Sequence, residues 1–415
     1  MNKKMILNTS EVVTCSGFEP KFGKDMQDIG VIEKGAIVIE GNIIKAVGKE
    51  ENILKEFNKK EYTIIDAEGK SVMPGFIDSH THFVFGGYRE EEFSWRLRGD
   101  DYMDIMRRGG GIVSTVKSTK QASLEELVES GRKRLDSMIK YGVTTVEGKS
   151  GYGLDLETEI KQLKAMKELQ KDHSIDIAVT FLGPHAVPEE YKGKEDEFID
   201  FQIEEVLPQV IKNKLADFAD IFCEEGVFDI EQSRRFLAKA KEMGLKLKLH
   251  ADEIVQLGGA ELGAELGAIS ADHLLQVSDK GIKDMAEKGV ISTLLPGTAF
   301  CLKEEYANGR KMIDMGCAVA LATDLNPGSC FTNSVPLIIS LAALYMNLTP
   351  EEIVTALTIN SAAALDRVSE TGSIDPGKKA DILILDYPSY KFLPYHVGVN
   401  IVKTVIKDGK IVQKN

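Results

Sequence analysis

The sequence predicts an α/β protein, with a (β/α)8 TIM-like barrel and a small β-sandwich domain built from both chain termini. In the middle of the chain, short apolar runs alternate with helical patterns of roughly 10 to 18 residues, which is typical of parallel strands and their crossover helices. Both ends carry short β-rich runs and turns instead. We therefore expect residues 1–72 and 367–415 to form the β-sandwich domain, and residues 73–366 to form the barrel.

The N-terminal part contains a predicted hairpin. Two β-rich runs, 35–40 and 43–48, flank the turn pair Gly41-Asn42, a spacing typical of two antiparallel strands. Residues 62–66 are a further candidate strand. At the other end of the chain, we expect strands at 380–386, 399–406 and 410–412, the last two separated by the turn Lys407-Asp408-Gly409.

The middle of the chain contains eight apolar runs, the number of strands in a closed (β/α)8 barrel. They are 74–82, 144–147, 177–182, 218–223, 245–250, 270–275, 290–295 and 318–323. Helical patterns between them include 123–140, 156–171, 230–243 and 278–288.

Polar residues stand at the ends of several of these runs. They are His80, His82, Glu147, His185, His250, His273 and Asp324. Because the carboxyl ends of barrel strands form the active-site face, we expect these side chains to converge in space although they are scattered in sequence.

A metal site is the hypothesis that this pattern favours. In an extended segment, His80 and His82 point to the same face, so both can reach one cation. Asp324 ends an almost purely apolar run, where an unpaired buried carboxylate would be costly and a metal ion would relieve the cost. Three imidazoles, with His250 as the third, and one carboxylate suit zinc, iron or another first-row transition metal. His273 is either a fifth ligand or a proton-handling group beside the metal.

Composition excludes several classes of protein. The 415 residues carry 51 basic and 65 acidic side chains, a formal charge of −14, which disfavours nucleic-acid binding. An anionic small-molecule substrate stays possible, because a local arginine in a cleft can override the net field. The five cysteines form no Cys-x-x-Cys pair, which favours a reducing cytoplasm. No run of about 18 apolar residues exists, so we expect no membrane span.

The sequence resembles the amidohydrolase superfamily in residues 74–82, in His250, His273 and Asp324, and in the C-terminal segment 372–381. Within that superfamily it is most similar to the ring-opening hydrolases of histidine degradation. The segments that carry this second resemblance are 83–90, 109–116, 147–154, 182–188 and 324–329. Together they follow the same order over nearly the whole chain.

The resemblance implies one zinc or iron ion per subunit, held by His80, His82, His250 and Asp324. It implies substrate contacts at Arg89, Tyr152, His185, Glu253, Asn326, Gly328 and Ser329. It also implies catalytic duties for Asp324, His273 and Glu253, any of which could protonate the departing nitrogen. Lys149 follows a strand near the place where some relatives hold a carbamylated lysine between two metals, and we do not count it as a ligand. The resemblance further implies a homodimer.

The implied reaction is hydrolysis of the ring C–N amide bond of 4-imidazolone-5-propanoate by a metal-activated water, giving N-formimidoyl-L-glutamate. Arg89 would then pair with the propanoate carboxylate. One alternative is another cyclic-amide hydrolase or an aminohydrolase (deaminase), which would share the ligands but need not share Arg89, Tyr152 and His185. The other alternative is an inactive scaffold. Trp95 is expected to be structural, and the role of Tyr102 stays open.

Overall fold

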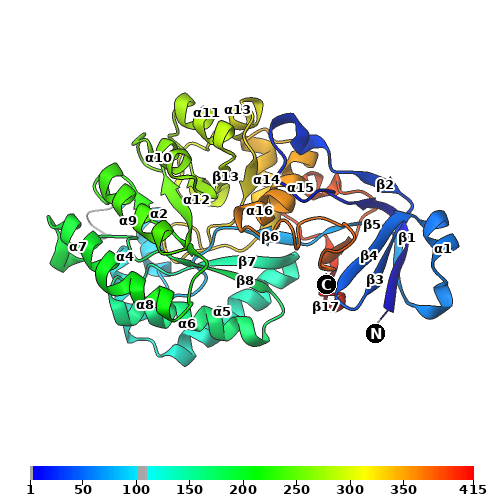
Figure 1. Ribbon diagram of the computed structural model, residues 1–415, viewed down its shortest axis with the longest axis horizontal. Helices are drawn as coiled ribbons and strands as arrows, with labels where there is room; N and C mark the ends of the chain where they lie inside the picture. Colours follow the sequence, from blue (N-terminus) through cyan, green and yellow to red (C-terminus); the bar gives the residue numbers. More distant parts are fainter. Residues whose placement is uncertain (1–2, 101–107, 109) are drawn as a thin grey trace.

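The computed structural model describes residues 3–100, 108 and 110–415, and shows a parallel barrel beside a sheet made from both chain termini (Figure 1). The barrel strands run in the order β14-β13-β12-β11-β9-β8-β7-β6, and β10 also pairs with β11. Their bounds are β6 Phe76–Asp78, β7 Val143–Lys149, β8 Asp176–Phe181, β9 Phe218–Ala219, β10 Phe222–Cys223, β11 Lys246–Ala251, β12 Ser270–His273, β13 Ile291–Leu294 and β14 Val319–Leu321.

The segments that follow β6 and β14 close the barrel. The backbone N–H of Asp324 donates to His80 O at 3.0 Å, and that of His82 donates to Leu325 O at 2.9 Å. Thr81 and Leu325 form an isolated parallel bridge. The predicted barrel is confirmed, and its seam runs through two of the segments that carry predicted metal ligands.

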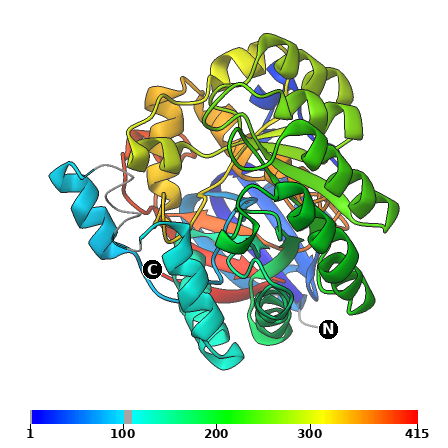
Figure 2. The same cartoon turned by 90° about the vertical axis from the view of Figure 1, so that its left-hand side faces the viewer.

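The helices lie around the outside of the barrel (Figure 2). The predicted helical patterns correspond to α5 Leu124–Met138, α6 Leu156–Asp172, α9 Ile230–Glu242 and α11 Asp279–Lys288. Sequence signals fix their starts, because Ser123 and Asp229 each form a capping box at the first turns of α5 and α9. The other helices are α1 Glu50–Glu56, α2 Glu90–Arg98, α4 Ile112–Gln121, α7 Glu195–Phe201, α8 Leu207–Lys212, α10 Gly259–Leu266, α12 Pro296–Leu302, α13 Gly309–Asp314, α14 Val335–Tyr345, α15 Pro350–Leu357, α16 Ile359–Ala364 and α17 Phe392–Tyr395.

Two of the predicted barrel strands are interrupted in the structure. The run 74–82 breaks at Gly75, where an added Cβ would lie 2.3 Å from Thr144 Oγ1, so the chain passes too close to its neighbour for any side chain. The run 218–223 breaks at Asp220, which separates β9 from β10. Gly75 stands at the amino end of β6, where the chain leaves the terminal sheet, and Asp220 stands between β9 and β10.

The terminal sheet has the strand order β17-β16-β15-β5-β1-β3-β4, with β2 paired to β1. Its strands are β1 Lys3–Val13, β2 Val31–Glu33, β3 Gly35–Glu40, β4 Ile43–Lys49, β5 Thr63–Pro74, β15 Ile382–Leu385, β16 Val402–Lys407 and β17 Lys410–Lys414. Strand β15 pairs with β5, so the two ends of the chain meet in one sheet. Ile6, Ile37, Ile382 and Ile406 share one fully buried apolar core. The β domain drawn from both termini is confirmed, whereas its exact limits in the sequence stay a prediction.

Among the described helices, none has the length and apolar character needed to cross a lipid bilayer.

A buried ion pair joins the terminal sheet to the barrel. Lys407 of β16 is 1% exposed, and its Nζ lies 2.8 Å from Asp381 and 2.8 Å from Asp176 of β8. We predict that Lys407→Met lowers the free energy of unfolding by about 3 kcal/mol, because it leaves the buried Asp381 carboxylate without its cation. Urea unfolding would measure the change.

Lys403→Met is the matched control for this prediction. Lys403 lies on the same strand but is 34% exposed, and its partner Glu68 is 59% exposed, so the loss should stay below about 1 kcal/mol. Equal losses in the two variants would contradict the prediction.

Candidate active site

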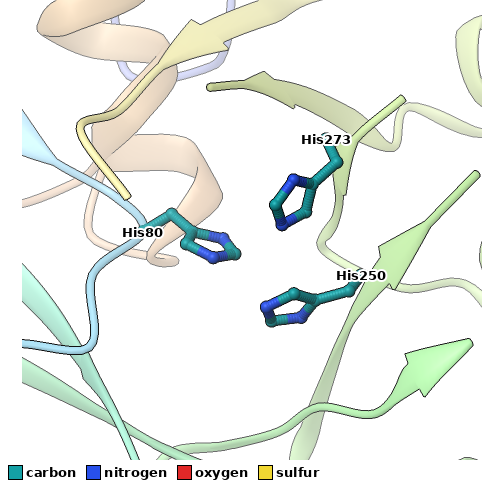
Figure 3. Close-up of side chains that lie close together, drawn as sticks. All are labelled: His80, His250 and His273. Carbon is teal, nitrogen blue, oxygen red and sulfur yellow. The ribbon is translucent and has the colours of Figure 1, made fainter. Parts of the chain in front are cut away.

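Histidines from three parts of the barrel converge at its carboxyl end. His80, His250 and His273 present ring nitrogens within 4.8 Å of one another, and their rings face a common space (Figure 3). His82 joins the same group, with its ring centroid 5.4 Å from that of His80 and 5.6 Å from that of His250. The predicted convergence of distant strand ends is therefore what the structure shows.

Asp324 approaches this group from the other side of the barrel seam. Its Oδ1 lies 3.6 Å from His80 Nε2 and 3.7 Å from His82 Nε2. These spacings leave room for a single ion between the three atoms, since metal bonds to nitrogen and oxygen are about 2.0–2.2 Å long. The second oxygen, Oδ2, accepts a hydrogen bond of 2.6 Å from Thr298 of α12, which fixes the direction of the carboxylate.

Two of these side chains leave their strands with unusual backbone angles. His273 has φ 76° and Asp324 has φ 51°, both in the left-handed region that residues other than glycine seldom occupy. Such strain persists only where the surrounding structure over-determines it, and it is common at functional sites. Here it turns the chain at two strand ends where side chains line the cavity.

Two aspartates fix the orientation of two histidines. Asp272 Oδ2 lies 2.6 Å from His80 Nδ1, and Asp220 Oδ1 lies 3.1 Å from His250 Nδ1. Because a carboxylate only accepts, each ring carries its proton on Nδ1 and leaves Nε2 as a free lone pair. This arrangement is typical of metal-binding histidines.

The donor set fits a metal ion. In the part of the chain that the structure describes, His80 Nε2 and His250 Nε2 are buried and have no hydrogen-bond partner. Buried polar atoms are rarely left unpaired, so these atoms call for a ligand. Burial is the largest cause that lowers the pKa of His80, His82 and His250 well below its usual range, which keeps the rings neutral as metal binding requires.

A cavity of about 310 Å³ opens directly above this group. All seven predicted substrate-contact residues line it: Arg89, Tyr152, His185, Glu253, Asn326, Gly328 and Ser329. His82, His250, His273 and Asp324 form its floor. Gly111 and Ile112, from the segment 109–116 that carried the resemblance, also line it. Sequence reasoning missed four further lining residues: Glu92, Arg96, Phe222 and Leu302. The cavity therefore joins the histidine group to a cationic end.

Two guanidinium groups define that cationic end. Arg89 Nη2 lies 2.8 Å from Glu92 Oε2, and Arg96 Nη2 donates to Gly328 O at 3.1 Å. Among the described residues, Arg89 pairs with Glu92 through Nε and Nη2 and no partner is found for Nη1. An added Cβ on Gly328 would lie 2.2 Å from Nη1. A side chain at position 328 would therefore have to displace the Arg89 guanidinium.

Asn326 and His185, two further predicted substrate contacts, differ in whether their side-chain polar atoms are available to a ligand. The amide of Asn326 is used within its own loop, where Oδ1 accepts from the N–H groups of Gly328 and Ser329 at 2.8 Å each. His185 Nδ1 donates to Gly151 O at 3.0 Å, and its ring stacks on His82 with centroids 5.0 Å apart. Asn326 thus shapes the loop, while His185 Nε2 stays free to contact a ligand.

The pKa values of Glu253 and His273, which lie side by side, are shifted in opposite directions. Burial, followed by Asp324 and Glu224, raises the pKa of Glu253 to about 8, whereas burial lowers the pKa of His273 to about 4. His273 Nδ1 and Glu253 Oε1 lie 3.5 Å apart. In the metal-free protein these shifts favour the protonated carboxyl group of Glu253 and the neutral ring of His273.

Two further expectations concern aromatic residues. Trp95 does not line the cavity, and the Arg108 guanidinium lies 5.1 Å from the centroid of its ring. Tyr102 lies outside the described residues.

A parallel barrel with a buried histidine–aspartate group beside a cavity defines a hydrolase of the amidohydrolase type. The amidohydrolase family model matches residues 71–412. Imidazolonepropionase from Clostridium tetani is 66% identical over 99% of this chain and 98% of its own length. Imidazolonepropionase from Parabacteroides distasonis is 58% identical over 99% of both chains. The chain belongs to the amidohydrolase family and, within it, to the imidazolonepropionases.

Solved structures support the fold alone. A 5-methylcytosine deaminase from Klebsiella pneumoniae matches with a TM-score of 0.74 at 16% identity, over 99% of this chain and 98% of its own. A triazine hydrolase variant matches with a TM-score of 0.72 at 18% identity, over 100% of this chain and 95% of its own.

We predict that Glu253→Gln changes how stability depends on pH in the metal-free protein. The folded state holds the Glu253 proton up to about pH 8, whereas the unfolded chain releases it near its usual pKa of about 4.3. The folded state therefore binds more protons between these values, and its stability falls as pH rises through this window. We expect urea unfolding at several pH values to show a smaller decrease in the free energy of unfolding for the variant than for the wild type. The same pH dependence in both proteins would contradict the prediction.

Proposed function

We propose that this chain hydrolyses the ring C–N amide bond of 4-imidazolone-5-propanoate, giving N-formimidoyl-L-glutamate in L-histidine degradation. Its relatives named imidazolonepropionase match over nearly their whole length. The observation that carries the proposal is the single cavity that joins the histidine–aspartate group to the Arg89 guanidinium. A substrate with a hydrolysable ring at one end and a carboxylate at the other fits such a cavity.

The metal would be one zinc or iron ion, with His80, His82, His250 and Asp324 as ligands. When bound, such an ion supplies an activated water by lowering the pKa of that water towards about 7.

Lys149 is unsuited to bridge a second ion. Burial lowers the pKa of Lys149, but Asp220, Glu147 and Asp272 more than offset this and raise it. The lysine stays an ammonium ion, which neither accepts carbon dioxide nor binds a cation.

Arg89 would hold the propanoate tail. Arg89 lines the cavity beside Gly328, and a guanidinium–carboxylate pair is strong where water is largely excluded. Ser329 adds a hydroxyl at the same end. At the other end, Tyr152 and His185 flank His82, with ring centroids 5.6 Å and 5.0 Å from it, so both can contact the ring of the substrate.

The proton transfers fall to three residues. Asp324 would accept the proton of the attacking water. His273 would hydrogen-bond the water and stabilise the developing oxyanion, because its neutral ring offers both a donor and an acceptor. Glu253 would protonate the departing nitrogen, because its burial raises its pKa and so favours the protonated form that a general acid needs.

We further propose that the protein acts as a homodimer in the cytoplasm. The five cysteines are free thiols, four of them buried, which is the usual state in a reducing compartment. Light scattering coupled to size exclusion would test the dimer.

Turnover of 4-imidazolone-5-propanoate tests the proposal directly. We expect conversion with about one zinc or iron per chain. His80→Ala should lose both metal and activity, whereas His173→Ala, outside the cavity, should keep both. A metal-loaded protein that ignores this substrate but deaminates a purine or opens another cyclic amide would overturn the substrate assignment. A folded, metal-free and inactive wild-type protein would favour the scaffold.

Arg89→Met tests recognition of the tail. We expect kcat/KM to fall about 10- to 100-fold, mainly through KM, because one charged hydrogen-bonded pair is lost. Arg89→Met with Glu92→Gln avoids leaving the Glu92 carboxylate unpaired. Arg98→Met, at an exposed position of the helix that follows Arg89, is the control. Unchanged KM in the double variant would exclude Arg89 as the carboxylate site.

A further inference from the structure

A cluster of five charged side chains lies beneath the histidine group. We call it the ionic cluster, and its members are Glu147, Lys149, Asp220, Lys248 and Asp272. All five side chains are fully buried. Charges in the core of a barrel are costly unless each has partners, so the arrangement of this cluster needs an explanation.

Lys149 is the centre of the ionic cluster. Its Nζ lies 2.7 Å from Asp220 Oδ2, 3.0 Å from Glu147 Oε1 and 3.5 Å from Asp272 Oδ2. Lys248 takes the other side of Glu147, at 2.9 Å, and donates to Ser79 O at 3.0 Å. Three carboxylates and two ammonium groups thus hold four segments of the barrel together.

Two carboxylates of this cluster also contact the histidines. Asp220 contacts Lys149 through Oδ2 and His250 through Oδ1, so the two ends of this carboxylate are both engaged. Asp272 receives the Nδ1–H of His80 on Oδ2 and a hydrogen bond of 2.6 Å from Ser270 on Oδ1. A movement of Lys149 would therefore be transmitted to His250 through Asp220 and to His80 through Asp272.

We propose that Lys149 is a positioning residue for the metal centre, holding Asp220 and Asp272 so that His250 and His80 keep their protons on Nδ1 before any metal arrives. This inference rests on the proposed metal centre. Lys149 touches no predicted ligand, and it acts only through the two aspartates.

The physical reason lies in the geometry of the two carboxylates. Without the ammonium group, Asp220, Asp272 and Glu147 share one buried space with only Lys248 as a cation. Their mutual repulsion would turn the carboxylates away from the rings, and the Nε2–H tautomer would then become populated. That tautomer places a proton on the atom that must bind the metal, so binding would have to displace it.

Two explanations of Lys149 predict opposite changes in metal affinity when the lysine is removed, so the direction of the change distinguishes them. If Lys149 acted only as a nearby positive charge, its removal would strengthen the attraction for a cation. If it acts by position, its removal weakens metal binding. We expect Lys149→Met to lower zinc affinity about 10- to 100-fold, the range measured when groups that orient metal ligands are lost.

The experiment compares Lys149→Met with Lys407→Met. Both remove a buried lysine held between carboxylates, but Lys407 lies where the terminal sheet meets the barrel. Zinc affinity is measured by competition with a chromogenic chelator. The inference predicts weaker binding in Lys149→Met and wild-type binding in Lys407→Met. Equal or tighter binding in Lys149→Met, or the same loss in both, would overturn it.

A second measurement needs no variant and covers the case in which Lys149→Met fails to fold. Long-range nitrogen–proton NMR spectra of the metal-free wild-type protein report the tautomer of each histidine. His80 and His250 should appear as Nδ1–H forms, and Nε2–H forms or a mixture would overturn the inference. Wild-type protein that binds no zinc would instead refute the proposed metal centre, so the two failures are distinguishable.

Discussion

The seam of the barrel is the constraint on which the site depends. Residues 80–82 and 323–325 are hydrogen-bonded to each other, and Asp78 also binds the backbone and hydroxyl of Thr323, 245 residues further along the chain. These bonds close the cylinder and, at the same time, bring Asp324 beside two histidines. The backbone bonds that close the barrel therefore also position Asp324 beside His80 and His82.

The floor of the cavity shows how the fold tolerates many buried polar groups. Four neutral imidazoles stand over five charged side chains, and each charge in the layer below is matched to a partner within about 3 Å. The layer above leaves lone pairs free. Each charge of the ionic cluster thus has a partner, whereas ring nitrogens of His80, His250 and His273 have none among the described residues.

Much of the fold and site could be predicted from the sequence. The alternation of apolar runs with helical patterns predicted the barrel. The position of His80, His250, His273 and Asp324 at the ends of apolar runs predicted that they belong to the site. Those signals are local, so they could not reveal Asp220 and Asp272 as partners of His250 and His80, because that role depends on pairing across strands. The one sequence signal for Asp220 was its charge inside an apolar run. No sequence signal singled out Glu92 or Arg96, because both lie in a helix rich in charged residues.

The pairing of β15 with β5 has a consequence for synthesis of the chain. Strand β5 is complete when residue 74 has been made, but its partner β15 begins only at residue 382. At about 5–20 residues per second, the ribosome needs roughly 15 to 60 s to cover that interval. Throughout it, the nascent chain carries an unpaired strand edge that can pair with another chain. Such a protein should depend on chaperones during translation more than its stable barrel would suggest.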